Sequence, residues 1–362
     1  MQPAPSPKPR YLIELESAVG RTWERIADAA TATAQERETI QAALGGRGLV
    51  PADCSFVVFG SLARGELTPK SDVDWTLLVD GQADPQHMPM AQAIARALQV
   101  LERKEPGPTA TFGGLTFSHD LIHQIGGQDD TNRNTTRRIL LLLESMEIGR
   151  VGVRDRVMRG LLRRYLDEDR GYHALHDWRI RAPHFLLNDI VRFWRTMAVD
   201  YAAKRRDRNW DGWAIRNFKL RMSRKLIFAA GLAMCMSCDL GTDALRAAAS
   251  SKDSSEVYAA LQDQLMRFAN RPPLESIAAF GMELGAEKVV GELFDAYDQF
   301  LGVLADTQQR ERLEKIPHDE AAEDPIFTTS REIGRAFQTA LTKLFFDTNP
   351  ALTRATQRYG VF

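Results

Sequence analysis

The sequence predicts an α+β protein in which a small domain with a mixed sheet is followed by an all-helical domain. Short apolar runs that end at glycine or at a turn lie within residues 49–150, and such runs are typical of buried strands. Beyond residue 150, apolar residues recur at three- and four-residue steps, which is the helical period. We therefore expect an N-terminal tail and helix over residues 1–48, a sheet domain over 49–150 and a helical domain over 151–362.

The same periodicity predicts where the helices lie. A helix over residues 11–44 is expected to pack on the sheet, because its apolar residues form one stripe. A loosely alternating segment over residues 113–125 is expected to form one or two strands. The other expected helices span residues 88–105, 135–146, 155–165, 184–204, 213–238, 242–268, 273–306 and 328–346.

The composition predicts a protein with a sizeable hydrophobic core and without a strong overall electrostatic field. Hydrophobic residues make up 44% of the 362 residues, and the net charge of −1 does not favour nucleic acid or membranes globally. The sequence contains no apolar stretch of about 18 residues, and residues 1–10 lack the apolar segment of a signal peptide. Three cysteines do not form a disulfide framework. We therefore expect a cytoplasmic protein that does not span a membrane.

The most informative stretch begins with an apolar strand that ends in a tight turn. The β-prone residues 57–59 predict a strand, and Gly60 ends it. Gly60 and Ser61 then open a short helix, whose free backbone N–H groups can hold an anion. This stretch therefore predicts a phosphate-binding turn.

Two carboxylates follow this turn at a spacing of two residues. Residues 68–71 are typical of a turn, and residues 75–79 continue into an apolar strand. We expect Asp72 and Asp74 on this second strand, where side chains two apart point to the same face. Carboxylate oxygens are the ligands that hard divalent cations prefer, so the pair predicts a metal site facing the turn.

Together, Gly60-Ser61, a ten-residue spacer and Asp72-Val73-Asp74 resemble the signature of the DNA polymerase β-like nucleotidyltransferase superfamily. The resemblance covers roughly residues 50–150. It implies an enzyme that moves a nucleoside monophosphate group from ATP or another nucleoside triphosphate. It also implies Mg²⁺ or Mn²⁺ as the cofactor, with Asp72 and Asp74 as catalytic metal ligands.

Five residues are candidates for binding the nucleotide. Ser61 would donate its hydroxyl to the phosphates, and Gly60 would let the backbone approach them closely. Arg64 and Ser71 border the same turn and strand. Related enzymes often place a lysine of the helical half on the triphosphate, and Lys219 is the candidate for that role.

The resemblance also implies a third carboxylate on a later strand, which would help to bind the metal and to deprotonate the acceptor hydroxyl. Asp120 is the candidate, because residues 115–125 form the next strand-like run. Asp129 and Asp130 are the alternatives, although they lie in a polar segment that is typical of a loop.

The sequence is compatible with several classes of acceptor. The segments 64–67 and 71–74 resemble the protein-modifying branch, such as PII uridylyltransferases, so we expect a protein or another hydroxyl acceptor. The His-Asp metal-hydrolase segment of those enzymes is missing, so reversible nitrogen signalling is not implied. The alternatives are a cyclic or linear oligonucleotide synthase of bacterial defence, transfer to a tRNA end or to a small antibiotic, and a catalytically weak nucleotide-binding regulator. The sequence leaves the base preference and the oligomeric state open.

Overall fold

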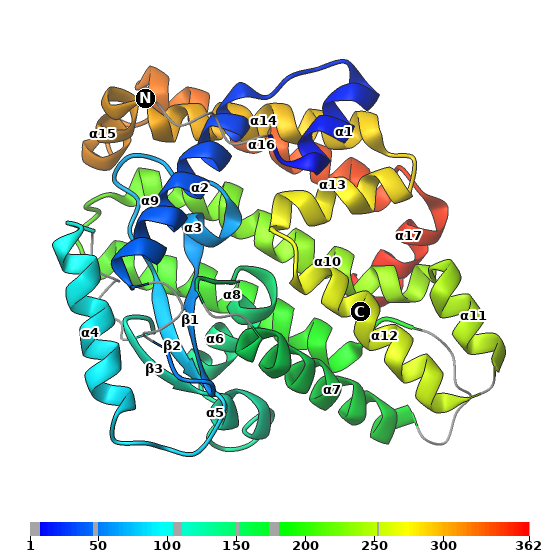
Figure 1. Cartoon of the computed structure of the whole chain (residues 1–362). Coiled ribbons are helices and arrows are strands. Elements are labelled where there is room, and N and C mark those ends of the chain that lie inside the picture. Colours follow the sequence, from blue (N-terminus) through cyan, green and yellow to red (C-terminus); the bar gives the residue numbers. More distant parts are fainter. Residues whose placement is uncertain are drawn as a thin grey trace.

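The computed structural model describes residues 8–45, 50–103, 111–149, 152–173, 181–251 and 253–361. It confirms the predicted α+β fold, with a small mixed sheet near the N-terminus followed by helices (Figure 1). The four strands lie in the order β3-β2-β1-β4. β1 is antiparallel to β2 and β4, whereas β2 and β3 are parallel. The strands are β1 (Cys54–Val58), β2 (Trp75–Val79), β3 (Gly114–Phe117) and β4 (Met146–Glu147).

Two helices replace the single one that was expected over residues 11–44. Gly20 has a φ of +67°, a left-handed conformation that ends the first helix and that glycine adopts without strain. The helices up to residue 143 are α1 (Arg10–Val19), α2 (Glu24–Ala43), α3 (Gly60–Arg64), α4 (His87–Val100), α5 (Ser118–His123) and α6 (Asn132–Leu143).

The second half of the chain is helical, as predicted, but several expected helices are divided. The helix expected over residues 213–238 contains a π-helical turn, η2, between α9 and α10. The elements are α7 (Val153–His173), α8 (His184–Asp207), α9 (Trp213–Lys219), η2 (Leu220–Arg224), α10 (Lys225–Leu240), α11 (Asp243–Ser251), α12 (Ser254–Ala269), α13 (Pro273–Glu283), α14 (Glu287–Ala305), α15 (Thr307–Lys315), α16 (Pro325–Phe346), α17 (Pro350–Ala355) and η3 (Thr356–Val361).

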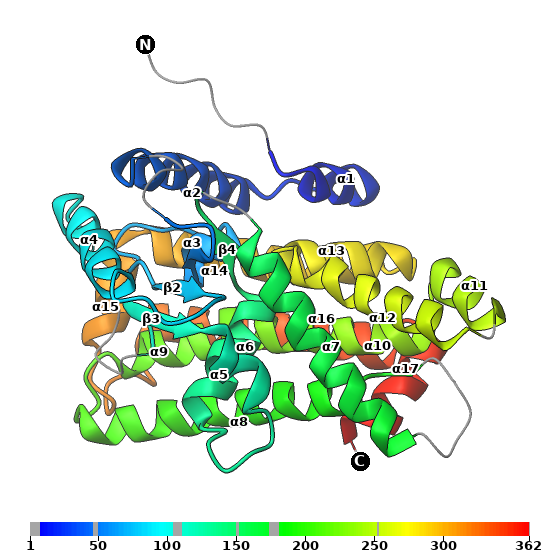
Figure 2. The same ribbon diagram turned by 60° about the horizontal axis from the view of Figure 1, so that its bottom comes forward.

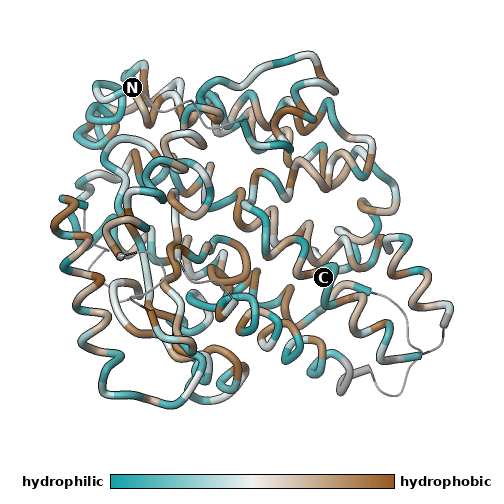
Figure 3. Tube along the Cα trace, viewed as in Figure 1, coloured by the Kyte–Doolittle hydropathy of each residue, from teal (hydrophilic) through white to brown (hydrophobic). Residues whose placement is uncertain are grey.

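The two faces of the sheet belong to two different cores. Phe56 and Val58 point to one face and pack with residues of α4 and of the C-terminal end of α2. Val57 lies on the other face and joins a large core that includes side chains from both sides of residue 150. Brown and teal segments alternate along many of the surrounding helices (Figure 3), as expected for helices with one buried face. The sheet is therefore built into the helical part of the molecule.

The N-terminal helices connect the sheet to the C-terminal half. Figure 2 shows α1 and α2 lying across α13 and α14. Trp23 donates its indole N–H to Asp295 of α14 at 2.9 Å, whereas Ile40 near the other end of α2 packs into the core of the sheet. α2 thus packs on the sheet at one end, as predicted, and on α14 at the other.

Among the described residues, no single helix is long and apolar enough to span a membrane. One bent pair, residues 213–240 with 243–250, meets the criteria of length and composition when its two parts are taken together.

Candidate functional site

The predicted turn after the first strand is present and brings the backbone close to a carboxylate. Gly60 begins α3 with a φ of +69°, and a Cβ atom added there would lie 3.4 Å from Asp74 Oδ2. The N–H of Phe59 donates to the carbonyl oxygen of Asp74 at 2.8 Å, which holds the two segments side by side. Glycine is therefore favoured at position 60 by the left-handed φ, whereas a Cβ atom there would meet Asp74 at an ordinary contact distance.

Asp72 and Asp74 come directly before β2 rather than on it, because the strand begins at Trp75. Both side chains are half-buried, and within the described ranges neither carboxylate has a hydrogen-bond or ion-pair partner. Burial, and next the charge of Asp72, raise the pKa of Asp74 to about 7. Two adjacent carboxylates without a protein partner fit a hard divalent cation, which would supply the missing positive charge.

The helical half contributes two cations to the surroundings of Asp72 and Asp74, namely the predicted Lys219 and Arg224. The charges that act on Lys219 include Asp72, and those that act on Asp74 include Arg224. A π-helical turn closes its hydrogen bond over five residues, so η2 brings Lys219 and Arg224 to the same side. Burial, and next the charge of Arg310, lower the pKa of Lys219 to about 8. Its ammonium group has no hydrogen-bond or ion-pair partner among the residues that the structure describes.

Arg64 occupies a different position from the one predicted for a triphosphate ligand. Its side chain is 7% exposed, and it donates to Glu66 at 2.7 Å and to Glu144. Glu144 also accepts the backbone N–H of Gly60 at 3.2 Å. Because the guanidinium donates to these two carboxylates, Arg64 stabilises the turn from its buried side and is not free to bind phosphate.

The two serines of the predicted site differ in their hydrogen bonding. The hydroxyl of Ser61 has no partner in the described part of the chain, so it is available to a ligand. The hydroxyl of Ser71 accepts the N–H of Thr68 at 3.2 Å and lies 3.2 Å from its hydroxyl. The predicted turn over residues 68–71 is present, and Ser71 closes it.

The structure corrects the position of Asp120. Residues 118–123 form α5 rather than a strand, and Asp120 lies in its first turn. β2 and β3 are parallel, with Val79 opposite Phe117. Asp74 precedes the start of β2, whereas Asp120 follows the end of β3, so the two residues lie at opposite ends of the sheet. Its carboxylate lies 3.4 Å from Gln124 Nε2 and 3.7 Å from His119 Nδ1. The structure does not bring Asp120 to the carboxylate pair.

The alternative third carboxylates are also placed elsewhere. Asp130 is buried between Arg138 at 2.6 Å and Arg192 at 3.2 Å. Asp129 is exposed. Besides Asp72, the charge of Glu144 acts on Asp74, so Glu144 is the further carboxylate close to this site. Its two oxygens are already bonded to Arg64 and Gly60, which makes it a support for the turn.

Replacing Asp120 by asparagine should leave nucleotidyl transfer within about twofold of the wild-type rate, because the carboxylate lies outside the site. The comparison is of steady-state rates at saturating Mg²⁺ and nucleotide. Asp129→Asn is the matched control, since this carboxylate is exposed. A loss of more than about tenfold, with the fold intact, would show that Asp120 reaches the reacting atoms.

Arg310 of α15 holds the turn that leads to the carboxylates. Its guanidinium is 5% exposed and donates to Thr68 Oγ1 at 3.3 Å, to the carbonyl oxygen of Pro69, and to that of Lys70 at 3.1 Å. Lys70 has a φ of +67°, a conformation that costs a non-glycine residue about 1 kcal/mol or more. The bonds from Arg310 therefore stabilise a strained turn two residues before Asp72.

Replacing Arg310 by methionine should weaken Mn²⁺ binding by about tenfold, since the loss of charge-assisted bonds frees the turn and displaces Asp72. The rate at saturating Mn²⁺ should stay within about threefold of wild type. Both are measured by titrating Mn²⁺ in binding and turnover assays. Arg312→Met is the control, because Arg312 of the same helix pairs with Asp324 at 2.6 Å. An unchanged Mn²⁺ affinity would contradict this role of Arg310.

Asp74→Asn should change stability in a pH-dependent way. The carboxyl group ionises near pH 4 in the unfolded chain but near pH 7 in the folded one, so metal-free stability falls as the pH rises between these values. At pH 8 the asparagine variant should therefore be more stable by about 1–3 kcal/mol, and near pH 4 the difference should vanish. Urea unfolding in EDTA at both pH values measures this. The same difference at both pH values would contradict the buried charge.

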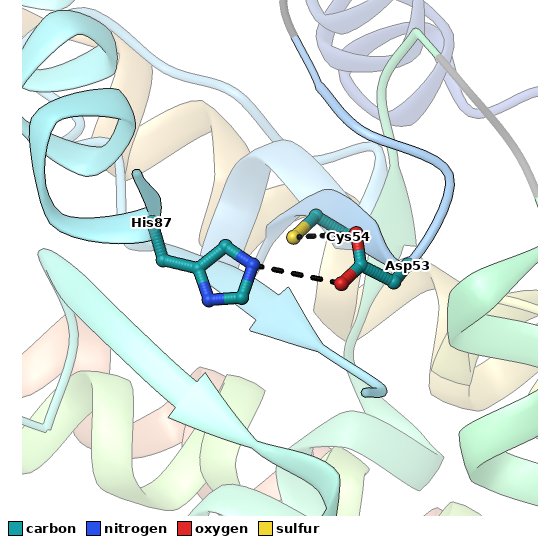
Figure 4. Close-up of side chains that lie close together, drawn as sticks. All are labelled: Asp53, Cys54 and His87. Carbon is teal, nitrogen blue, oxygen red and sulfur yellow. Dashed lines mark hydrogen bonds and ion pairs between the residues drawn. The ribbon is translucent and has the colours of Figure 1, made fainter. Parts of the chain in front are cut away.

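A second cluster of metal-ligating groups lies at the opposite end of β1 (Figure 4). Ligand atoms of Asp53, Cys54 and His87 lie within 4.8 Å of one another, with His87 Nε2 3.6 Å from Asp53 Oδ2. However, His87 Nδ1 accepts the N–H of Asp84 at 3.2 Å, so the proton of the neutral ring is on Nε2. That proton faces Asp53 where a metal would have to bind. The geometry therefore fits a contact between the Nε2–H of a neutral His87 and the Asp53 carboxylate, which fastens α4 to β1.

Three residues at the site were not predicted from the sequence. Glu144 follows a run of four leucines at the end of an expected helix, and a carboxylate directly after such an apolar run was its signal. Arg224 and Arg310 lie in charged segments that resemble exposed helix surface. Their contacts with residues far away in the chain become visible in the folded structure.

Comparison with known families agrees with this geometry. Residues 15–103 match the sequence profile of a family described as "Putative nucleotidyltransferase DUF294". The match covers both N-terminal helices in part or whole, the Gly60 turn, the carboxylate pair and α4. Among curated proteins, none matches the sequence. The mixed sheet, the turn with its two carboxylates and the family match over residues 15–103 are consistent with a nucleotidyltransferase-type domain in the N-terminal part of this chain.

Proposed function

We propose that this protein is a metal-dependent nucleotidyltransferase that moves a nucleoside monophosphate group from a nucleoside triphosphate to a hydroxyl group of a protein or another acceptor. In this reaction the acceptor oxygen forms a bond to the α-phosphorus. The bond from that phosphorus to the bridging oxygen of the β-phosphate breaks, and pyrophosphate and a proton are released. The family match supports nucleotidyl transfer in general, and the donor and cofactor are part of the proposal.

The observation that carries the proposal is a set of charged groups left without partners in the described residues. Asp74 lies against the Gly60 turn, the charge of Asp72 acts on it, and Lys219 of the helical half interacts with Asp72. Unpaired charges of both signs are costly in a partly buried place unless a ligand completes them. A divalent cation with a triphosphate supplies both missing partners.

The residues of the site fit Mg²⁺ or Mn²⁺. When bound, such an ion would neutralise charge on the phosphates and orient the α-phosphate for in-line attack. Asp72 and Asp74 would hold it through carboxylate oxygens. Lys219 and Ser61 would bind phosphate oxygens, because the ammonium and the hydroxyl have no other partner. Arg64 and Glu144 would keep the turn in place below the phosphates.

The test uses purified protein with each of four α-labelled nucleoside triphosphates and Mg²⁺ or Mn²⁺, together with acceptor panels. We expect metal-dependent release of pyrophosphate and transfer of the label. A labelled protein band would identify a protein acceptor, and a small phosphatase-resistant product would identify a cyclic oligonucleotide. Nucleotide binding without any turnover across all panels would instead favour the catalytically weak regulator.

A further inference from the structure

A cavity of about 460 Å³ adjoins the carboxylate site on its helical side. It lies between α6, α8 and the α9–η2 helix, with Phe112 at the approach to β3. Along α8 its lining extends from Phe193 to Lys204, a distance of about 16 Å at the helical rise. The cavity therefore has the size of a nucleotide and an elongated shape.

The lining of this cavity is strongly cationic. Asp200 is the acidic residue in it, and Lys204 pairs with that carboxylate at 2.7 Å. Arg224 pairs with Glu144 at 3.4 Å. Three cationic side chains of the lining have no hydrogen-bond or ion-pair partner among the described residues, namely Arg133, Arg216 and Lys219.

Arg216 is the most informative of these cations. Its Nε and Nη2 atoms are buried and have no hydrogen-bond partner within the described chain. Buried polar groups in folded proteins are nearly always bonded, and an orphaned guanidinium is especially costly. Lys219 follows one helical turn later on α9, so both side chains present unmatched charge to the same cavity.

The cations fall into two groups according to the charges around them. Lys219 and Arg224 interact with Asp72 and Asp74, and therefore belong to the metal end. The charges that act most on Arg216 are those of Arg208 and Asp211. The charge of Arg133 acts on Arg137 of α6 and lowers its pKa. Arg133 and Arg216 both line the cavity, and neither is among the charges that act most on Asp74 or Lys219, so the two are named the second cationic group.

A donor nucleotide would leave the charge of this second group without a counter-charge. Its negative charge is confined to the triphosphate, which the metal end would hold, and its base and ribose are uncharged. Neutral oxygens and nitrogens of the donor can accept hydrogen bonds from the guanidinium groups, but they do not neutralise two positive charges. A further anionic group on another molecule would complete the second group.

We infer that this cavity binds the acceptor, and that the acceptor is a small molecule with its own phosphate or carboxylate group. The inference rests on the proposed nucleotidyl transfer. It favours an acceptor such as a nucleotide or a phosphorylated metabolite over a side chain of a folded protein. The anionic group anchors the acceptor on Arg216 and Arg133, and its hydroxyl faces the metal end.

The experiment measures binding of two ligands to the full chain by calorimetry. The first is the α,β-methylene analogue of whichever common nucleoside triphosphate binds tightest, with Mg²⁺. The second is inorganic pyrophosphate, added once the analogue is saturating. Pyrophosphate should bind the loaded protein one to one. Arg216→Met and Arg133→Met should each weaken it by about tenfold and leave the affinity for the analogue within about twofold.

Two further variants make the result specific. Arg216→Lys should keep most of the pyrophosphate affinity, because the charge is retained. Arg206→Met should behave as wild type, since Arg206 is an exposed arginine of α8 outside the cavity. Exclusion of pyrophosphate by the analogue, or a loss of analogue affinity in the Arg216 variant, would show that the donor fills the cavity and would overturn the inference. Failure of the analogue to bind wild-type protein would instead overturn the proposed function itself.

Discussion

Replacing Asp72 and Asp74 together by asparagine should reduce nucleotidyl transfer by about 10³-fold or more. Asparagine offers a neutral amide oxygen, which is a much weaker ligand for a hard divalent cation than a carboxylate. The fold should remain intact, because neither carboxylate bonds to another described residue and their mutual repulsion is removed. Pyrophosphate release and thermal unfolding are measured on the same preparation.

The control for this double variant is Asp129→Asn, which removes an exposed carboxylate outside the site. It should retain the wild-type rate. Full activity of the double variant would show that the metal is held elsewhere, and unfolding of the variant would show that the pair has a structural role.

Replacing Lys219 by methionine should lower kcat/KM by about 100-fold, because the variant loses a charged contact to the triphosphate in a partly buried site. Stability should not fall. Lys219 has no ion pair in the described structure, and the charges of Arg310 and Arg224 oppose its own. A variant that loses activity while its unfolding free energy is unchanged or raised would identify a ligand-binding cation.

Lys225→Met is the matched control for Lys219→Met. Lys225 lies six residues further along and donates to Gln338 at 2.6 Å, so it should be dispensable for transfer. A loss of stability in the Lys219 variant with an unchanged kcat/KM would contradict its placement at the phosphates.

The Gly60 turn was predictable because its determinants are local. An apolar strand, a glycine, a serine and two carboxylates at short spacing define the turn within the sequence, and the structure places them together. Lys219 was found through resemblance to related enzymes. Its relation to Arg224 depends on the π-helical turn, which has no recognisable sequence pattern.

The structure differs from the expected strand at Asp120 and from the expected surroundings of Arg64, for different physical reasons. Residues 113–125 alternate loosely, so the point at which β3 gives way to α5 was hidden, and the parallel register then carries Asp120 to the far end of the sheet. Arg64 resembled a free cation beside a phosphate site. Its partner Glu144 lies 80 residues away, and a buried ion pair over that separation cannot be read from local spacing.

Binding of Mn²⁺, followed by electron paramagnetic resonance, tests the central claim most directly, because it needs no knowledge of the acceptor. In the presence of a nucleoside triphosphate, the wild-type protein should bind Mn²⁺ in a site that the Asp72→Asn, Asp74→Asn double variant lacks. Lys219→Met should weaken nucleotide binding but retain Mn²⁺ binding at Asp72 and Asp74. Equal Mn²⁺ binding by the wild type and the double variant would contradict the assignment of these two carboxylates.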